Sequence, residues 1–155
     1  MKKIEHLING KLNSNFVNDT SSVFNPATGE EASQVVLGTE KCVQDAVKSA
    51  KNAYISWSAE TPLMRSRKMF KLKAIIESRK NELAELITLE HGKTFDDALG
   101  EVGRGLEVVE FACGIPNLLA GNYTSEVGRS IDSWSDNQPL GIVAGITPFN
   151  FPVMV

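Results

Sequence analysis

The chain has 155 residues, of which 42% are hydrophobic and 23% are charged, so it is long enough for one globular domain and too apolar for a disordered one. Its formal net charge of -3 argues against a nucleic-acid partner or a membrane surface, and no run of 18 apolar residues predicts a membrane span. Cys42 and Cys113 lie too far apart in the sequence for a disulfide framework or a metal site. We therefore expect a cytoplasmic protein that binds no metal.

Extended structure is predicted for the first forty residues. Residues 4–12 alternate in polarity around Asn9-Gly10, a pair typical of a two-residue hairpin turn. Residues 21–25 and 32–38 predict a second pair of strands, and the Asn-Pro and Thr-Gly pairs of residues 25–30 favour a turn between them. Together these segments predict an N-terminal β-arm.

Two helices follow the β-arm. Residues 39–57 carry apolar side chains at helical spacing, and Thr39 is placed to cap the first turn. A second helix is predicted to begin at Thr61-Pro62, where threonine caps and proline fits the first helical position, and to run to about Arg79.

Two further helices come next. The third covers about residues 81–91 and stops at Gly92. The fourth begins after the capping residue Thr94 and reaches about Leu119, with a kink or break expected at Pro116. Cys113 falls in an apolar run of this helix, where a buried, inert thiol is expected.

The last thirty residues read as β-structure. Residues 123–135 predict a hairpin or an extended arm. Residues 140–146 (Leu-Gly-Ile-Val-Ala-Gly-Ile) are apolar on both faces, as a buried parallel strand is. Residues 151–155 end the sequence on apolar side chains, so we expect an element that is interrupted there.

Arg104 is the first candidate site residue. It lies among Gly100, Gly103 and Gly105, and each glycine costs a helix about 1 kcal/mol relative to alanine. The glycines allow another backbone to pack closely, or they clear space so that the Arg104 guanidinium grips a ligand carboxylate. The residues alone leave both interpretations open.

Asn150 is the second candidate. Residues 147–152 (Thr-Pro-Phe-Asn-Phe-Pro) form a stiff bend after the predicted strand, at the strand end where open α/β sheets bind ligands. The Asn150 side chain either stabilises an oxyanion as a fixed donor or caps the turn.

Several segments resemble the aldehyde dehydrogenase family in the family's order: residues 25–30, the alanine-rich helix ending at Trp57, Arg65, residues 86–93 (Leu-Ile-Thr-Leu-Glu-His-Gly-Lys) and residues 147–152. Phe149, where most members carry tryptophan, together with residues 100–112, resembles the CoA-acylating methylmalonate-semialdehyde dehydrogenases.

The resemblance implies an enzyme that oxidises malonate or methylmalonate semialdehyde with NAD, loses CO2 and passes the acetyl or propionyl group to CoA. It implies that Asn150 is the catalytic oxyanion donor, that Thr147 and Phe149 line the NAD site, and that Arg104 binds the substrate carboxylate. It also implies a homo-oligomer, commonly a tetramer. The family's nucleophilic cysteine would lie beyond Val155, so we expect the chain alone to be inactive.

The predicted fold is α/β, a truncated aldehyde dehydrogenase fold. Residues 1–139 would form the β-arm and helices of the NAD-binding domain. Residues 140–155 would hold the first Rossmann-like strand and the oxyanion and cofactor loop, with the rest of the cofactor domain and the catalytic domain absent. Because a lone parallel strand cannot bury both faces or pair its backbone, we expect residues 140–155 to be poorly folded unless another chain or the missing part covers them. Two alternatives stay open: a non-catalytic truncated relative that acts as an interaction module, and a hydrolytic aldehyde dehydrogenase.

Overall fold

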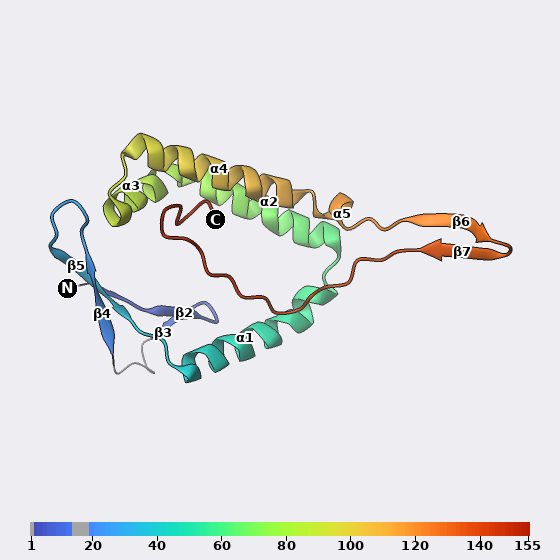
Figure 1. Cartoon of the computed structure of the whole chain (residues 1–155), viewed down its shortest axis with the longest axis horizontal. Coiled ribbons are helices and arrows are strands. Elements are labelled where there is room, and N and C mark those ends of the chain that lie inside the picture. Colours follow the sequence, from blue (N-terminus) through green and yellow to red (C-terminus); the bar gives the residue numbers. More distant parts are fainter. Residues whose placement is uncertain (1, 14–18) are drawn as a thin grey trace.

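The protein is elongated, with β-structure at both ends and helices between them (Figure 1). The structure is a computed structural model that describes residues 2–13 and 19–155. In chain order the elements are β1 (Lys2–Ile4), β2 (His6–Ile8), β3 (Lys11–Asn13), β4 (Thr20–Phe24), β5 (Glu31–Val36), α1 (Glu40–Ala59), α2 (Pro62–Ser78), α3 (Lys80–His91), α4 (Phe95–Cys113), α5 (Ile115–Leu118), β6 (Tyr123–Gly128) and β7 (Ile131–Trp134).

The N-terminal β-arm is confirmed. Strands β1, β5 and β4 form one sheet in that order, with β1 parallel and β4 antiparallel to β5. Strands β2 and β3 form the predicted hairpin, whose turn residues Asn9 and Gly10 have φ angles of 53° and 70°. Both angles are positive, as the turns favoured in two-residue hairpins require.

The helix starts are confirmed by their caps. Thr39, Thr61 and Thr94 each accept a hydrogen bond from the backbone N–H three residues further on, at 3.3 Å. These bonds satisfy donors that the first turn of a helix otherwise leaves unpaired. Helix α3 ends at Gly92, whose φ of 84° is the left-handed conformation that glycine adopts freely.

The predicted end of the fourth helix is wrong. Helix α4 stops at Cys113, and the N–H of Gly114 turns back to the carbonyl of Phe111 at 3.0 Å. Pro116 then lies in the first turn of the short helix α5, where a proline needs no hydrogen-bond partner for its nitrogen. The glycine ends the long helix, and the proline helps to start the next one.

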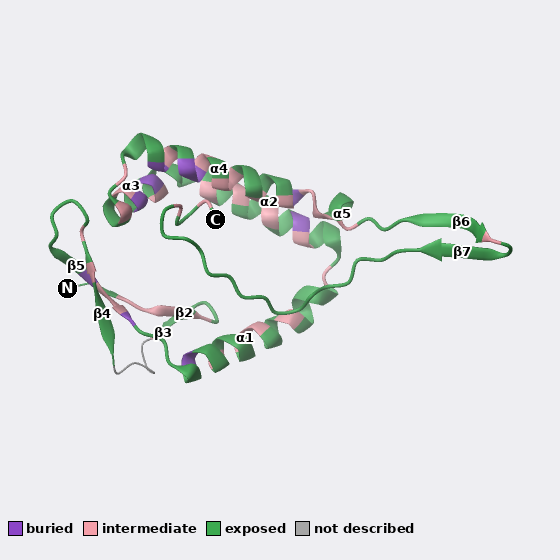
Figure 2. Cartoon of the chain, viewed as in Figure 1, coloured by how far each residue is buried: buried purple, intermediate pink, exposed green. Residues whose placement is uncertain are grey.

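The core is small and lies where α3 packs on α4 (Figure 2). Its fully buried members are Ala84, Ile87, Ala98 and Val102. Helix α2 packs on the other part of α4, and there the buried hydroxyl of Ser66 donates to the carbonyl of Cys113 at 2.6 Å. These two contacts make α2, α3 and α4 one layer.

The last residues form a long irregular segment, which we call the C-terminal strap (residues 135–155). It returns from the β6–β7 hairpin past α1 and reaches α4 (Figure 1). Its beginning is fixed by a hydrogen bond from the Ser135 N–H to the Asn122 carbonyl at 2.9 Å. Its end is fixed by hydrogen bonds from Val153 and Met154 to Glu101.

The β-strand predicted for residues 140–146 is not formed in this chain. These residues are exposed, and none of them pairs with another strand in the described part of the chain. A parallel strand needs hydrogen-bonded neighbours and cover on both faces. Without them the apolar sequence stays extended and irregular.

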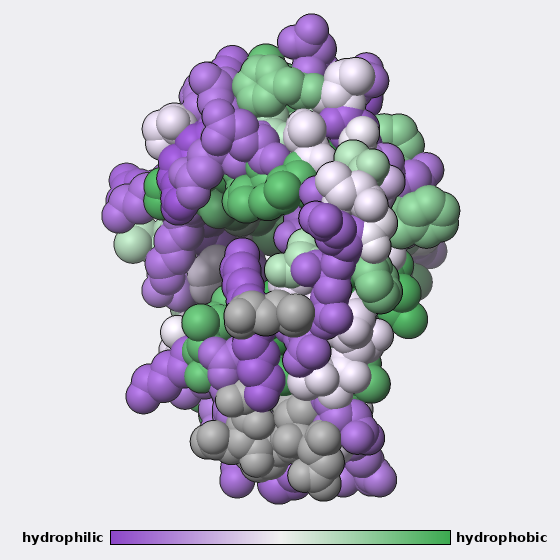
Figure 3. Space-filling view, turned by 90° about the vertical axis from the view of Figure 1, so that its left-hand side faces the viewer, coloured by the Kyte–Doolittle hydropathy of each residue, from purple (hydrophilic) through white to green (hydrophobic). Residues whose placement is uncertain are grey.

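The surface is large for the mass of the chain. Its solvent-accessible area is 11595 Å², whereas a compact monomer of 16.9 kDa exposes about 7,700 Å². Hydrophobic side chains reach the surface among hydrophilic ones at the end that carries the N-terminal sheet (Figure 3). Among the described helices, none is long and apolar enough to cross a membrane.

Candidate functional site

The loop of residues 147–152 is attached to the helices by Lys93. The Lys93 ammonium group donates to the backbone carbonyl of Asn150 at 2.9 Å and to the Glu101 carboxylate at 2.5 Å. Lys93 belongs to the short connection between α3 and α4, and Glu101 lies in the second turn of α4. One lysine therefore links the predicted oxyanion donor to the helical layer.

Glu101 completes this attachment from the other side. Its second carboxylate oxygen accepts the N–H of Val153 at 2.8 Å and the N–H of Met154 at 3.3 Å. The side chain is fully buried, and burial by itself would raise the pKa of Glu101. The hydrogen bonds from Lys93 and from the two backbone N–H groups outweigh burial, so that the pKa lies below its ordinary value.

Two cations face the ring of Phe151, which follows Asn150. The Lys93 nitrogen lies 4.7 Å from the ring centroid, and the Arg104 guanidinium carbon lies 5.7 Å from it. Cations at this distance are attracted to the electron-rich face of an aromatic ring. Phe151 therefore brings Arg104, on α4, next to the loop that carries Asn150.

The Arg104 guanidinium thus lies close to the loop that carries Asn150, although 46 positions separate the two residues in the sequence. Arg104 is exposed and forms no ion pair within the described part of the chain. Only the backbone carbonyl of Asn150 is engaged by a described residue. A guanidinium without an ion-pair partner in the described chain and a side-chain amide on the neighbouring loop are therefore available, the first suited to a carboxylate and the second to a developing oxyanion.

The glycines around Arg104 have different surroundings. A methyl group on Gly105 would lie 3.2 Å from the Cα atom of Met154, so this glycine lets the C-terminal strap approach α4 closely. Close backbone packing, the first of the two interpretations of these glycines, is confirmed at this position. At Gly100 and Gly103 the same methyl group would meet no described atom within 4 Å.

Thr147 and Phe149 lie on the exposed side of the loop. The Phe149 ring is 88% exposed and Ile146 is fully exposed, so apolar groups line this side without cover from the chain itself. A flat ligand group could pack one of its faces against such an apolar surface. No dinucleotide-binding glycine motif of the Gly-x-Gly-x-x-Gly type occurs in the sequence.

Lys93 and Glu101 were missed as site residues in the sequence. Glu101 carried a signal, because it follows Ala98 by three positions and precedes Val102, and both of these residues are buried on the same face of α4. A carboxylate on a buried helical face needs partners. Lys93 ends the family-like segment of residues 86–93, but its partners lie 8 and 57 residues away, so the sequence does not show which groups it binds.

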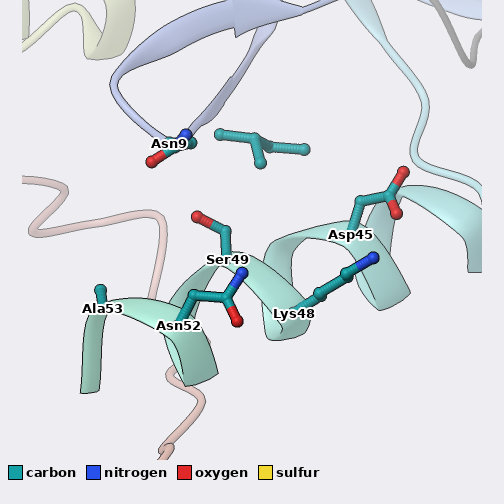
Figure 4. A pocket seen from close by; sticks show the side chains of 7 residues that line it. Asn9, Asp45, Lys48, Ser49, Asn52 and Ala53 are labelled. Atoms are coloured by element: carbon teal, nitrogen blue, oxygen red, sulfur yellow. The ribbon is translucent and has the colours of Figure 1, made fainter. Parts of the chain in front are cut away.

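A separate hollow lies between the β2–β3 hairpin and α1 (Figure 4). It has a volume of about 340 Å³ and is lined by Ile8, Asn9, Asp45, Lys48, Ser49, Asn52 and Ala53. None of the four predicted site residues lines it. We assign it no part in the site formed by Arg104 and the loop.

The two cysteines are both buried, as expected for Cys113. Within residues 2–13 and 19–155, no three His, Cys, Asp or Glu side chains gather as a metal site would require. The nucleophile of a thioester mechanism is not evident at either thiol, because neither one borders residues 147–152 in the sequence or lies among the contacts of that loop.

Comparison with known proteins finds relatives that match the whole chain. The model of the aldehyde dehydrogenase family matches residues 14–155. The malonate-semialdehyde dehydrogenase of Pseudomonas aeruginosa is 45% identical over the full chain, which spans 31% of the length of that relative. A methylmalonate-semialdehyde/malonate-semialdehyde dehydrogenase [acylating] of Caenorhabditis elegans, described as probable and mitochondrial, is 46% identical over 96% of the chain and 28% of its own length.

Solved structures agree. The methylmalonate-semialdehyde dehydrogenase of Oceanimonas doudoroffii superposes with a TM-score of 0.95 at 51% identity, over 100% of this chain and 32% of its own. A protein of Sinorhizobium meliloti 1021, described as a methylmalonate-semialdehyde dehydrogenase and solved with NAD, also gives 0.95, at 46% identity over 99% of this chain and 31% of its own. The α/β fold is therefore a part of the fold of these enzymes.

Proposed function

The chain belongs to the aldehyde dehydrogenase family, and from that premise we propose that it forms part of an NAD-dependent enzyme that oxidises malonate or methylmalonate semialdehyde and transfers the acyl group to CoA. Relatives with these substrates in their names are 45% and 46% identical to it. Since the chain spans about a third of their length, the activity is assigned to the larger enzyme of which this segment is a part.

One observation carries the proposal. Arg104 and the loop of Asn150 lie next to each other, with the Arg104 guanidinium carbon 5.7 Å from the ring of Phe151. A semialdehyde acid has an aldehyde at one end and a carboxylate at the other. It therefore needs a cation and an oxyanion donor in one site, and Arg104 together with the adjacent loop of Asn150 supplies both kinds of group.

In this proposal each site residue has one task. The Arg104 guanidinium binds the carboxylate of the semialdehyde. The side-chain amide of Asn150 donates to the aldehyde oxygen as it gains negative charge during attack on the carbonyl carbon. Thr147 and Phe149 lie beside the nicotinamide cofactor, which accepts a hydride when bound. The acyl group left on the enzyme passes to CoA after CO2 is lost.

The test uses a hybrid in which this chain replaces the matching part of the Pseudomonas aeruginosa relative. We expect the hybrid to form NADH from malonate semialdehyde only when CoA is present, and the 155-residue chain alone to form none. Turnover without CoA would favour the hydrolytic alternative. Turnover by the isolated chain would overturn the assignment of the nucleophile to a region outside it.

The role of Arg104 is tested by replacing it with methionine in the hybrid. We expect kcat/KM for malonate semialdehyde to fall about 10- to 100-fold, which corresponds to the loss of about 1.5–3 kcal/mol from one charge-assisted hydrogen bond. Turnover of propanal, which lacks the carboxylate, should change little. Arg67→Met is the matched control, because Arg67 is an exposed arginine on α2 whose guanidinium donates to the Met64 sulfur within the same helix.

If Arg104→Met lowers the rates with both aldehydes equally, Arg104 does not recognise the carboxylate. The site would then lack the substrate specificity proposed for it.

A further inference from the structure

Asn150 lies in an irregular and exposed segment, yet an oxyanion donor must be held in one place. Removal of a fixed donor from an oxyanion site costs about 100- to 1,000-fold in kcat, so small displacements of such a donor matter. Residues 140–150 are exposed, and no described strand or helix includes them. The rigidity of Asn150 must therefore come from contacts that its own segment does not supply.

Those contacts come from two charged residues of the helical layer. Lys93 holds the carbonyl of Asn150 itself, and Glu101 holds the backbone N–H groups three and four positions later. Lys93 and Glu101 also bind each other at 2.5 Å. The ion pair of Lys93 and Glu101 thus hydrogen-bonds the loop backbone before and after Phe151.

Because this ion pair is buried, it is better suited to holding the loop in place than an ordinary surface ion pair is. Glu101 is fully buried and the Lys93 side chain is only 12% exposed, whereas the other ion pairs of the described chain have one or both partners well exposed. Burying two charges is costly unless their geometry and remaining hydrogen bonds are satisfied. Here the remaining bonds of both residues go to the backbone of residues 150–154.

We propose that Lys93 and Glu101 are positioning residues that fix the Asn150 amide relative to Arg104. The inference rests on the proposed function of Asn150 as the oxyanion donor. Neither residue touches the reacting atoms in this proposal. Both act by fixing the loop to α4, the helix that also carries Arg104.

The chain offers a matched control for Lys93. Lys68 also combines a carboxylate with an aromatic ring, since its nitrogen lies 2.7 Å from Glu60 and 5.1 Å from the ring centroid of Trp57. This second lysine is on α2, and its described contacts go to Glu60 and Trp57 rather than to residues 147–155. Lys93→Met and Lys68→Met therefore each remove one ion pair and one cation–aromatic contact, the first at the loop and the second away from it.

The first measurement is amide hydrogen exchange of residues 148–155 in the hybrid enzyme. We expect faster exchange in Lys93→Met and in Glu101→Gln, and unchanged exchange in Lys68→Met. Glutamine keeps an acceptor for Val153 and Met154, so Glu101→Gln tests the ion pair with little change in shape. Unchanged exchange in both Lys93→Met and Glu101→Gln would overturn the proposal.

The second measurement is a double-mutant cycle with Asn150→Ala. We expect Lys93→Met to lower kcat about 10- to 100-fold, as a misplaced catalytic group does, with KM for NAD changed less than about threefold. In the Asn150→Ala background the same change should cost less than about twofold, because the donor it positions is already gone.

Equal losses in both backgrounds would show that Lys93 does not act through Asn150, and would overturn the proposal. If Asn150→Ala itself leaves kcat unchanged, the proposed role of Asn150 fails instead. The exchange measurement still decides in that case whether Lys93 and Glu101 hold the loop.

Discussion

Glu101 shows how one side chain can fasten a segment that has no regular structure. It supplies acceptors to an ammonium group and to two consecutive backbone N–H groups, and it is fully buried while doing so. Hydrogen bonds to a charged carboxylate are stronger than those to a neutral group. The charge state of Glu101 should therefore control whether the end of the C-terminal strap stays attached.

Acid should detach the end of the C-terminal strap. Because the pKa of Glu101 is lowered below its ordinary value of 4.5 in the folded chain, its contribution to attachment is fully present above that value. The contribution is lost as the pH falls further, through the lowered pKa. We expect the amide resonances of Val153 and Met154, followed by NMR, to move toward unstructured values only below about pH 4.5.

Glu101→Gln should remove this pH dependence, since glutamine does not titrate. A transition of the Val153 and Met154 resonances that persists in this variant would assign the titration to another group.

At the scale of the elements, the packing of one helix on another depends on side-chain hydrogen bonds that the sequence pattern does not predict. Ser66 is buried and donates to the carbonyl of Cys113, 47 residues later, at 2.6 Å. That carbonyl is one of the last in α4, where helices lack internal partners. Ser66 therefore ties α2 to the end of α4.

Ser66→Ala should lower the free energy of unfolding by about 1–3 kcal/mol, because it leaves a buried carbonyl without its partner. Ser78→Ala is the control, since the Ser78 hydroxyl is exposed and donates to the Ile75 carbonyl within its own helix. Chemical denaturation of both variants measures the difference. Equal stability of the two variants would show that the Ser66 bond contributes nothing.

How far the sequence predicted the structure depends on the range of the interactions involved. The caps at Thr39, Thr61 and Thr94 and the Asn9-Gly10 turn were predicted correctly, because each depends on residues at most three positions apart. The end of α4 was misplaced because a glycine stops a helix as well as a proline does. The link from Lys93 to Asn150 spans 57 residues, which no local pattern encodes.

The candidate site was predicted in part for the same reason. Arg104 and Asn150 were recognised from their residue types, their glycine and proline neighbours and the family resemblance. Only the structure shows that Arg104 lies close to the loop of Asn150, through the ring of Phe151. The roles of Thr147 and Phe149 stay predictions, and so does the division of the chain at residue 139.

At the scale of the whole molecule, the chain leaves more surface in contact with water than its mass requires. The excess over a compact monomer is about 3,900 Å², several times the roughly 800 Å² that one partner buries in a standard protein interface. Leu140, Val143, Ile146 and Phe149 in the C-terminal strap contribute to it, each at least 75% exposed. Apolar side chains exposed to this degree are suited to being covered.

We expect the amides of residues 140–146 to exchange with solvent at nearly the unprotected rate in the isolated chain, because no described strand bonds to them. In the hybrid enzyme the same amides should be protected by neighbouring strands. Mass spectrometry of exchanged peptides compares the two. Strong protection in an isolated monomer would contradict this expectation.

The two fixed ends of the C-terminal strap have a consequence for how a sheet would be completed. Side chains in a strand alternate between faces, so a shift of one residue exchanges the inner and outer sets. The bond between Ser135 and Asn122 and the bonds between Glu101 and residues 153–154 restrict how far residues 140–146 can slide along the chain direction. A strand that adds to residues 140–146 would therefore meet a segment whose position is already restricted, and we expect it to pair in a single register.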